Sequence, residues 1–157
     1  MSDDLSRLEP WLAGLTARLT PAQRRQLARR IGQQLRRSNA ERVRRNVEPD
    51  GGAMEPRKPR VPRKADEKQG RVRNKGRMFR RIALARNLRV DAQPDQVEVG
   101  FVGAVQRTAR VHHHGLRDRV ARFRGAPEIR YAERRLIGFG PDDREAIMEA
   151  ALAHLQD

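Results

Sequence analysis

The sequence contains no cysteine and very few aromatic residues. Its 157 residues include one tryptophan, one tyrosine and four phenylalanines. Without cysteine the chain cannot form a disulfide, a thiolate zinc site or a cysteine nucleophile. Scarce aromatic side chains leave few platforms on which the bases of a single-stranded nucleic acid could stack. These absences exclude a disulfide scaffold and disfavour a single-strand-binding protein.

Long hydrophobic runs are also missing. No apolar stretch approaches the roughly 20 residues that a membrane-spanning helix requires. The acidic N-terminus leads into an amphipathic segment, which is not typical of a secretory signal. Leu, Ile, Val and Phe make up about 21% of the chain, close to the composition at which highly charged chains are disordered. We therefore expect a cytoplasmic chain with no membrane partner, and a core that does not organise every residue.

Positive charge is what the chain has in excess. It carries 35 Lys+Arg against 20 Asp+Glu, a formal net charge of +15. Residues 24–45 hold nine arginines and one acid, and residues 57–81 hold twelve basic residues and two acids. Two basic blocks indicate a polyanionic partner or an acidic protein surface. For the first block, a merely solvated arginine-rich face is the alternative.

Apolar periodicity predicts that residues 1–47 form a pair of helices. Leucines at three- and four-residue spacing predict a helix over about residues 4–19, and a second apolar stripe predicts a helix from Pro21 to about residue 46. Thr20 and Gln23 match the capping-box pattern between the two helices, and Pro21 suits a first helical position.

Residues 48–77 are predicted to form a basic arm. Four prolines and four glycines are spread through this segment, and apolar residues are scarce. A stretch of this length without regular structure is too long for a routine loop. It is either disordered in the free protein or an arm that orders against a partner, and we favour the arm.

Residues 78–157 are predicted to form an α+β core that ends in a C-terminal helix. The clearest strand signal is the alternation of Val97, Val99 and Phe101 with polar or small residues. The predicted order is a short helix over Met78–Asn87, a hairpin pairing Leu88–Ala92 with Gln96–Val102, a helix over Val105–His114 closed by Gly115 at C′, a strand over Ile129–Leu136 and a helix after Gly140. The predicted fold class is therefore α+β, with few strands.

The sequence contains no group of residues with the spacing typical of a catalytic or metal-binding site. Three consecutive histidines, His112 to His114, point about 100° apart on a helix and cannot all face one metal ion. A packing or capping role is the better interpretation. Asp142 and Asp143 suit the positive end of the helix that follows them. We therefore predict no catalytic residue, no metal site, no cofactor and no small-molecule substrate; the protein is not expected to be an enzyme.

Three segments carry a resemblance to a known family. They are Met78-Phe79-Arg80-Arg81, the run Ala109–Asp118 that contains the histidines, and the run Tyr131–Phe139. In this order and spacing they resemble the tail completion (virion morphogenesis) proteins of contractile-tailed temperate bacteriophages. The first helix, the Thr20–Arg25 helix start and the Pro49–Lys58 segment also fit, so the resemblance spans nearly the whole chain.

The resemblance implies a structural protein of the virion that acts at the head-proximal end of the tail and is needed for head–tail joining. It implies an oligomeric ring, a hexamer favoured, with tail tube, sheath or neck proteins as partners. Assembly would take place in the host cytoplasm. The alternative is a basic, non-specific nucleic-acid-binding protein. The two hypotheses overlap if a ring presents arginines to transiting DNA.

Three sets of candidate site residues follow. The predicted interface residues are Arg57, Lys58, Arg60, Arg63, Lys64, Met78 and Phe79. Residues predicted to shape the turn after the helix over 105–114 are His112, His114 and Gly115. Candidate contacts with DNA in a ring lumen are Arg29, Arg30, Arg36 and Arg37.

Overall fold

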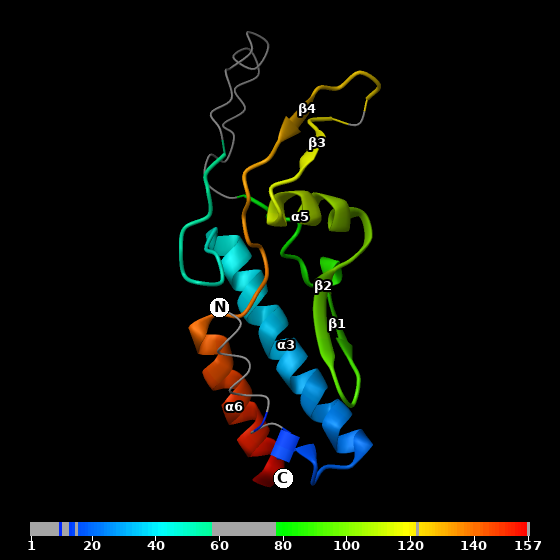
Figure 1. Ribbon diagram of the computed structural model, residues 1–157, viewed down its shortest axis with the longest axis vertical. Coiled ribbons are helices and arrows are strands. Elements are labelled where there is room, and N and C mark those ends of the chain that lie inside the picture. The colour runs from blue at the N-terminus through cyan, green and yellow to red at the C-terminus, as the bar shows by residue number, and fades with distance from the viewer. Residues whose placement is uncertain (1–9, 11–12, 15, 58–77, 122, 157) are drawn as a thin grey trace.

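The chain forms an elongated α+β structure (Figure 1). The computed structural model describes residues 10, 13–14, 16–57, 78–121 and 123–156. Its elements are α3 (Pro21–Arg45), η1 (Ala85–Asn87), β1 (Leu88–Ala92), β2 (Val97–Phe101), η2 (Gly103–Val105), α5 (Gln106–His113), β3 (Arg117–Arg119), β4 (Glu128–Arg130) and α6 (Pro141–Gln156). The predicted fold class is confirmed. Of the predicted helix over residues 4–19, the structure describes residues 10, 13–14 and 16–19; residues 10, 13, 14 and 16 are helical, and the other residues of this prediction lie outside the described ones.

The long helix α3 starts at the capping box that the sequence predicts. The Thr20 hydroxyl accepts the Gln23 N–H at 3.3 Å, and the Gln23 side chain accepts the Thr20 N–H at 2.9 Å. At the other end, Asn46 adopts a left-handed φ of 57° and closes the helix. Because start and stop are both encoded locally, the second predicted helix is confirmed to within a residue.

The β1–β2 hairpin packs along one side of α3 (Figure 1). Val90 pairs with Val99, and Ala92 with Val97, in an antiparallel register. Gly32 makes the close approach possible, since a Cβ on it would lie 2.4 Å from Val90 Cγ1 and 2.7 Å from Val97 Cγ2. The predicted hairpin is confirmed, with the second strand ending at Phe101.

Helix α6 packs along the other side of α3, and its starting residues hold the two helices together. The Asp143 carboxylate, 2% exposed, accepts the Ser38 hydroxyl at 2.5 Å and pairs with Arg42 at 2.8 Å. It also accepts the Gly140 N–H at 2.8 Å, so it caps its own helix. The predicted C-terminal helix is confirmed, and Asp143 has a second, tertiary role.

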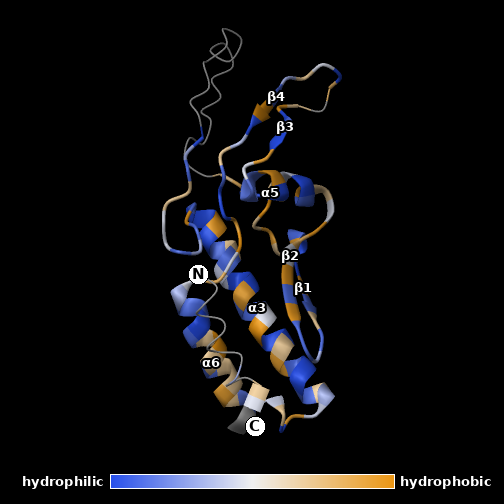
Figure 2. Ribbon diagram, in the orientation of Figure 1, coloured by the Kyte–Doolittle hydropathy of each residue, from blue (hydrophilic) through white to orange (hydrophobic). Residues whose placement is uncertain are grey.

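The core lies at the junction where α3 ends and α5 begins. It combines the end of α3 with residues on both sides of segment 58–77. Its buried members are Val43, Met54, Met78, Phe79, Ile82, Ala83, Ala109 and Leu136. Figure 2 shows hydrophobic residues on the inner sides of α3 and the hairpin, and others out on the β3–β4 ribbon. Among the described helices, none is both long and apolar enough to cross a membrane.

Two predicted elements differ from the structure. The predicted helix over Met78–Asn87 is wrong: turns occupy residues 80–83 and a short 3-10 helix follows at 85–87. Phe79 adopts a left-handed φ of 59°, which is incompatible with a continuous helix. The predicted strand over Ile129–Leu136 is also wrong in its bounds, since β4 ends at Arg130. Beyond it, the N–H groups of Arg134 and Leu136 donate to α5 instead of to a strand.

Candidate assembly interface

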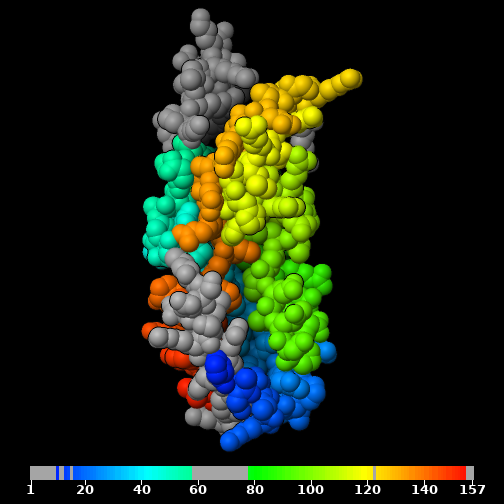
Figure 3. Space-filling model, viewed as in Figure 1, coloured from blue at the N-terminus to red at the C-terminus, as the bar shows by residue number. Residues whose placement is uncertain are grey.

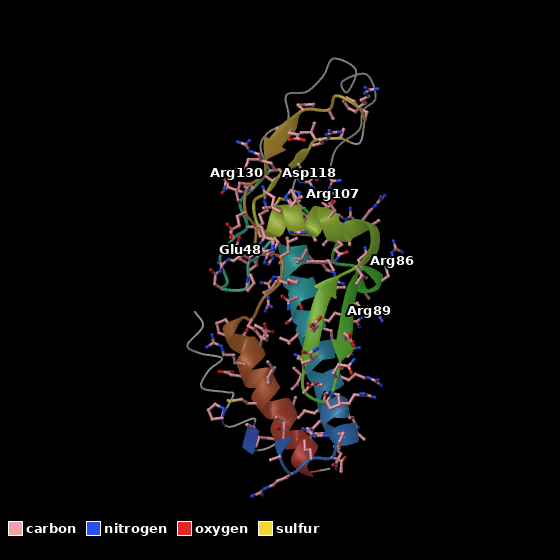
Figure 4. All side chains as sticks on the ribbon, turned by 45° about the vertical axis from the view of Figure 1, so that its right-hand side comes forward. Glu48, Arg86, Arg89, Arg107, Asp118 and Arg130 are labelled. Atoms are coloured by element: carbon pink, nitrogen blue, oxygen red, sulfur yellow. The ribbon has the colours of Figure 1, made fainter. Side chains whose placement is uncertain are left out.

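The most exposed regular element is the ribbon, defined here as residues 116–131, which contains β3 and β4. Asp118 pairs with Ile129 in antiparallel register, and the ribbon projects beyond the rest of the described chain (Figure 3). At its base Arg107 of α5 forms an ion pair with Asp118, with an Nε–Oδ2 distance of 3.2 Å. Figure 4 shows both side chains where the ribbon leaves α5. The hydrogen bond from Arg107 lowers the pKa of Asp118.

The ribbon is amphipathic although little packs against it. Side chains alternate between the two faces of a strand, and cross-strand partners share a face. Leu116, Val120 and Ile129 therefore lie on one face, and they are 38%, 47% and 43% exposed. The opposite face carries the charged side chains of Arg117, Arg119, Glu128 and Arg130. Such a pattern would normally indicate a buried face, yet here that face is open.

Phe123 extends the apolar surface to the tip of the ribbon. It is 62% exposed, the highest value among the exposed large hydrophobic residues described. Gly125 permits the turn that returns the chain, with a left-handed φ of 83°. Between the ribbon and α5 lies an open cavity of about 650 Å³ whose lining is mostly polar, with Val111 and Val120 beside charged residues that include Arg119 and Glu128. A partner could therefore reach both the tip and the underside of the ribbon.

A second apolar surface is the groove, defined here as the hollow between α3, β2 and residues 137–139. Its volume is about 450 Å³. Its lining is Leu35, Asn39, Val97, Glu98, Val99, Gly100, His113, Ile137, Gly138 and Phe139. Phe139 stands at its rim, 46% exposed. In the described part of the chain β2 pairs with β1 alone, so one edge of β2 is open.

The first ten residues of the predicted arm, 48–57, are described and pack against the rest of the chain, with Met54 in the core. The last three of them, Glu55–Arg57, are defined here as the arm root. The guanidinium of Arg134, a residue that is 5% exposed, donates from Nε to the Glu55 carbonyl at 2.6 Å and from Nη2 to the Pro56 carbonyl at 3.0 Å. Burial lowers the pKa of Arg134. Arg57 is exposed. Sequence reasoning did not single out Arg134, because its partners are backbone carbonyls 78 and 79 residues away.

The other predicted interface residues divide into two groups. Lys58, Arg60, Arg63 and Lys64 lie outside the described residues. Met78 and Phe79 are 6% and 7% exposed and belong to the core of this subunit. Their prediction as interface residues is therefore corrected, because apolar side chains next to the arm are used to close the core.

The histidine cluster packs in three different ways. His112 lies between Phe79 and Tyr131, with ring centroids 4.9 and 4.8 Å away. Its Nδ1 is 3.3 Å from Arg134 Nη1, and since a guanidinium only donates, Nδ1 is the acceptor. Burial, with the charges of Arg134 and Arg57, lowers the pKa of His112 to about 4. His112 is therefore neutral at pH 7 and joins the core to the root of the arm.

His113 and His114 sit at the end of α5. The Nδ1 of His113 accepts the Leu136 N–H at 3.2 Å, a contact that the sequence did not suggest. Burial lowers its pKa as well. His114 is the exposed C-cap, and Gly115 follows at C′ with a left-handed φ of 60°. A Cβ on Gly115 would also lie 3.1 Å from the Glu133 nitrogen, so the turn requires glycine for space and conformation.

The candidate DNA-contacting arginines lie on two stripes of α3. Arg29 and Arg36 are seven residues apart, as are Arg30 and Arg37, and the two stripes are about 100° apart around the helix. Arg29, Arg30 and Arg37 are exposed, whereas Arg36 is half-buried. Arg44 is exposed seven residues beyond Arg37 and extends one stripe to the end of the helix. The four residues thus share a broad side of α3 rather than one line.

Asp142 and Asp143, the acidic residues at the start of α6, lie where a structural role explains them. Asp143 is committed to Arg42, Ser38 and its own helix start, while Asp142 is exposed beside it. Within the described residues, no group of three or more His, Asp or Glu side chains is placed to hold a metal ion. The ribbon and the groove both expose large apolar side chains, and both suit protein contacts.

A small basic α+β chain with an exposed amphipathic ribbon has the features of an assembly subunit. Residues 3–156 match the phage virion morphogenesis family, and the chain belongs to this family. It is 35% identical over 155 residues to tail completion protein S of Escherichia phage P2, covering 98% of this chain and 99% of that protein. No solved structure matches the chain. The family resemblance inferred from the sequence is confirmed.

Proposed function

We propose that this chain is a structural protein that completes the phage tail at its head-proximal end and enables head–tail joining. The observation that carries the proposal is the match to a tail completion protein over almost the full length of both chains. A likeness that covers both chains from end to end favours a shared role rather than a shared module. The protein would act in the virion, after assembly in the host cytoplasm.

The proposed working form is a homo-oligomeric ring, a hexamer favoured, that contacts tail tube, sheath or neck proteins. Two features of the chain support it. The ribbon leaves its apolar side chains 38% to 62% exposed. The arm root is held by hydrogen bonds from the buried Arg134 to the Glu55 and Pro56 carbonyls. We propose that the interface includes Arg57, Lys58, Arg60, Arg63 and Lys64.

A test is complementation of a phage that lacks this gene. The wild-type chain should restore infectious particles, whereas a variant with those five arm residues changed to serine should give separate heads and tails by electron microscopy. A control variant neutralises five exposed arginines elsewhere: Arg80, Arg81, Arg86, Arg89 and Arg110. It should retain joining. Normal joining with the arm variant would contradict the arm's role, and normal joining without the gene would contradict the function itself.

The second candidate function is non-specific contact with DNA. It is favoured by the exposed Arg29, Arg30 and Arg37 on α3. Duplex affinity would fall steeply as salt rises, because each phosphate contact releases counterions. Reversing the charge at Arg29, Arg30, Arg36 and Arg37 should then weaken both duplex binding and DNA retention in particles. An unchanged variant would leave these arginines as a solvated face.

A further inference from the structure

We propose that the ribbon of one copy docks into the groove of the next copy, so that the ring is built from a head-to-tail contact between these two surfaces. This inference rests on the proposed function, which requires a ring, and it adds the pair of surfaces that join. The occupant of the groove is therefore a second copy of this chain.

The ribbon has the chemistry of an insert. Its apolar face and tip carry Leu116, Val120, Phe123 and Ile129, each between 38% and 62% exposed. These side chains come from a two-stranded ribbon, and an isolated pair of strands is only marginally stable in water. A second surface that covers the apolar face would stabilise the ribbon and remove this exposed area from solvent.

The groove has the chemistry of a receptor for such an insert. Leu35, Val97, Val99, Ile137 and Phe139 line it, and its volume of about 450 Å³ lies in the range of pockets that bind several apolar groups. The open edge of β2 runs beside it. An extended segment placed there could form backbone hydrogen bonds with this edge while its apolar side chains enter the groove.

Charge supports this pairing of surfaces. The ribbon holds five arginines and two acids, whereas residues 88–101, which contain the hairpin, hold one arginine and three acids. On the outer face of the hairpin Asp91 is the direct cross-strand partner of Glu98, and both are exposed. Like charges directly opposite each other destabilise a hairpin. An incoming ribbon carrying Arg117, Arg119 and Arg124 would neutralise this pair in a protein that is otherwise strongly basic.

The two surfaces are also distinct and separate. The ribbon projects beyond α5, while the groove lies beside the hairpin on the body of the molecule (Figure 1). A contact between different surfaces of identical chains is heterologous, and it forms a ring where the rotation between neighbours closes and an open filament where it does not. A self-complementary contact would stop at a dimer. The ribbon–groove contact thus accounts for a ring without requiring a further surface.

The test uses two full-length variants, each damaging one surface. Phe123→Asp places a charge at the ribbon tip and Phe139→Asp places one at the groove rim. The two side chains are 62% and 46% exposed, so thermal unfolding of each variant should change little. Native mass measurement should give a multi-subunit ring for the wild type and monomers for each variant. An equimolar mixture should give one-to-one heterodimers and nothing larger, since one intact ribbon meets one intact groove and the remaining surfaces are both defective.

Leu152→Asp is the matched control. It changes another apolar side chain, 49% exposed on α6, that belongs to neither surface, and it should leave the ring intact. Dissociation by this control, or rings that persist in both surface variants, would overturn the ribbon–groove contact. A wild-type chain that stays monomeric at all concentrations would overturn the ring as well. Loss of the tail completion function would register separately, in the complementation of the phage lacking the gene.

Discussion

The body of the molecule and its ribbon differ in how far their apolar side chains are exposed to solvent. The body, formed by α3, α6 and the β1–β2 hairpin, turns Leu27, Leu35 and Ile147 inward until they are at most 6% exposed. The ribbon leaves Val120, at 47%, and Phe123, at 62%, in solvent. Both regions carry apolar residues on one face of their elements, so the difference lies in what covers that face. The body therefore buries these residues within one chain, whereas the ribbon leaves its apolar residues exposed in the single chain, which is why we propose that a partner covers them.

The two regions also differ in charge. The hairpin and α6 are acidic segments of a basic protein, because α6 holds four acids and one arginine, while the ribbon is strongly basic. A uniform positive field would drive identical subunits apart. Segregated charge allows attraction between different parts of neighbouring copies, and the overall charge of +15 then leaves a positive surface for other partners.

The largest effect on stability is expected from a substitution that destabilises the body of the molecule. Asp143→Ala would remove the carboxylate that pairs with Arg42, whose side chain is 16% exposed. It would also remove the acceptor of the Gly140 N–H and leave the Ser38 hydroxyl with the Leu35 carbonyl. We expect the free energy of unfolding to fall by about 3 kcal/mol, as for a buried charge that loses its partner. Chemical denaturation measures this change.

The neighbouring residue provides the control for this substitution. Asp142 is exposed in the same first turn, so Asp142→Ala should cost only about 0.5 kcal/mol through the lost interaction with the helix dipole. Equal effects of the two substitutions would show that the Arg42 contact does not hold the helices together.

A smaller, pH-dependent effect on stability is expected from His112, which lies where the body meets the ribbon and the arm root. The pKa of His112 is about 4 in the folded chain, below the ordinary 6.5. The unfolded state therefore binds more protons between these values. The stabilisation is complete above pH 6.5 and is lost as pH falls toward 4. Because the ring is only half-buried, we expect a loss on the order of 1–2 kcal/mol, less than the full shift would give.

His112→Phe tests the assignment of this pH dependence. Phenylalanine preserves the packing against Phe79 and Tyr131 but does not titrate. Thermal unfolding of the variant should therefore depend less on pH between 6.5 and 4 than that of the wild type. His113, whose pKa is also lowered, would account for the remainder. An unchanged slope would assign the effect to other groups.

The parts that the sequence predicts well are those encoded by neighbouring residues. The α3 capping box needs only Thr20 and Gln23, and Gly115 is readable as C′ from the helix before it. The Asp143 network could not be predicted, since Ser38 is 105 residues away in the sequence. The ribbon was missed because its few apolar residues are interspersed with arginines and face solvent, which makes the segment indistinguishable from a polar loop.

The candidate site residues divide in the same way, into features that neighbouring residues encode and features that contacts between distant segments decide. The sequence indicated that basic residues and an unusual histidine turn matter, and it indicated the family. It gave no sign that Met78 and Phe79 are core residues, because burial depends on segments such as Met54 that meet them only in three dimensions. Arg134 was overlooked for the same reason, as its acceptors are backbone carbonyls rather than a recognisable acidic partner.

The most direct test of the central claim is amide hydrogen exchange of the wild-type chain as a dilute monomer and as an assembled ring. If the ribbon is completed by a neighbouring copy, residues 116–130 should gain protection on assembly, together with residues 97–100 and 137–139 that line the groove. Amides of α3 and α6 around Arg42 and Asp143 should be equally protected in both states. A ribbon that exchanges equally fast in the ring and in the monomer would contradict the account.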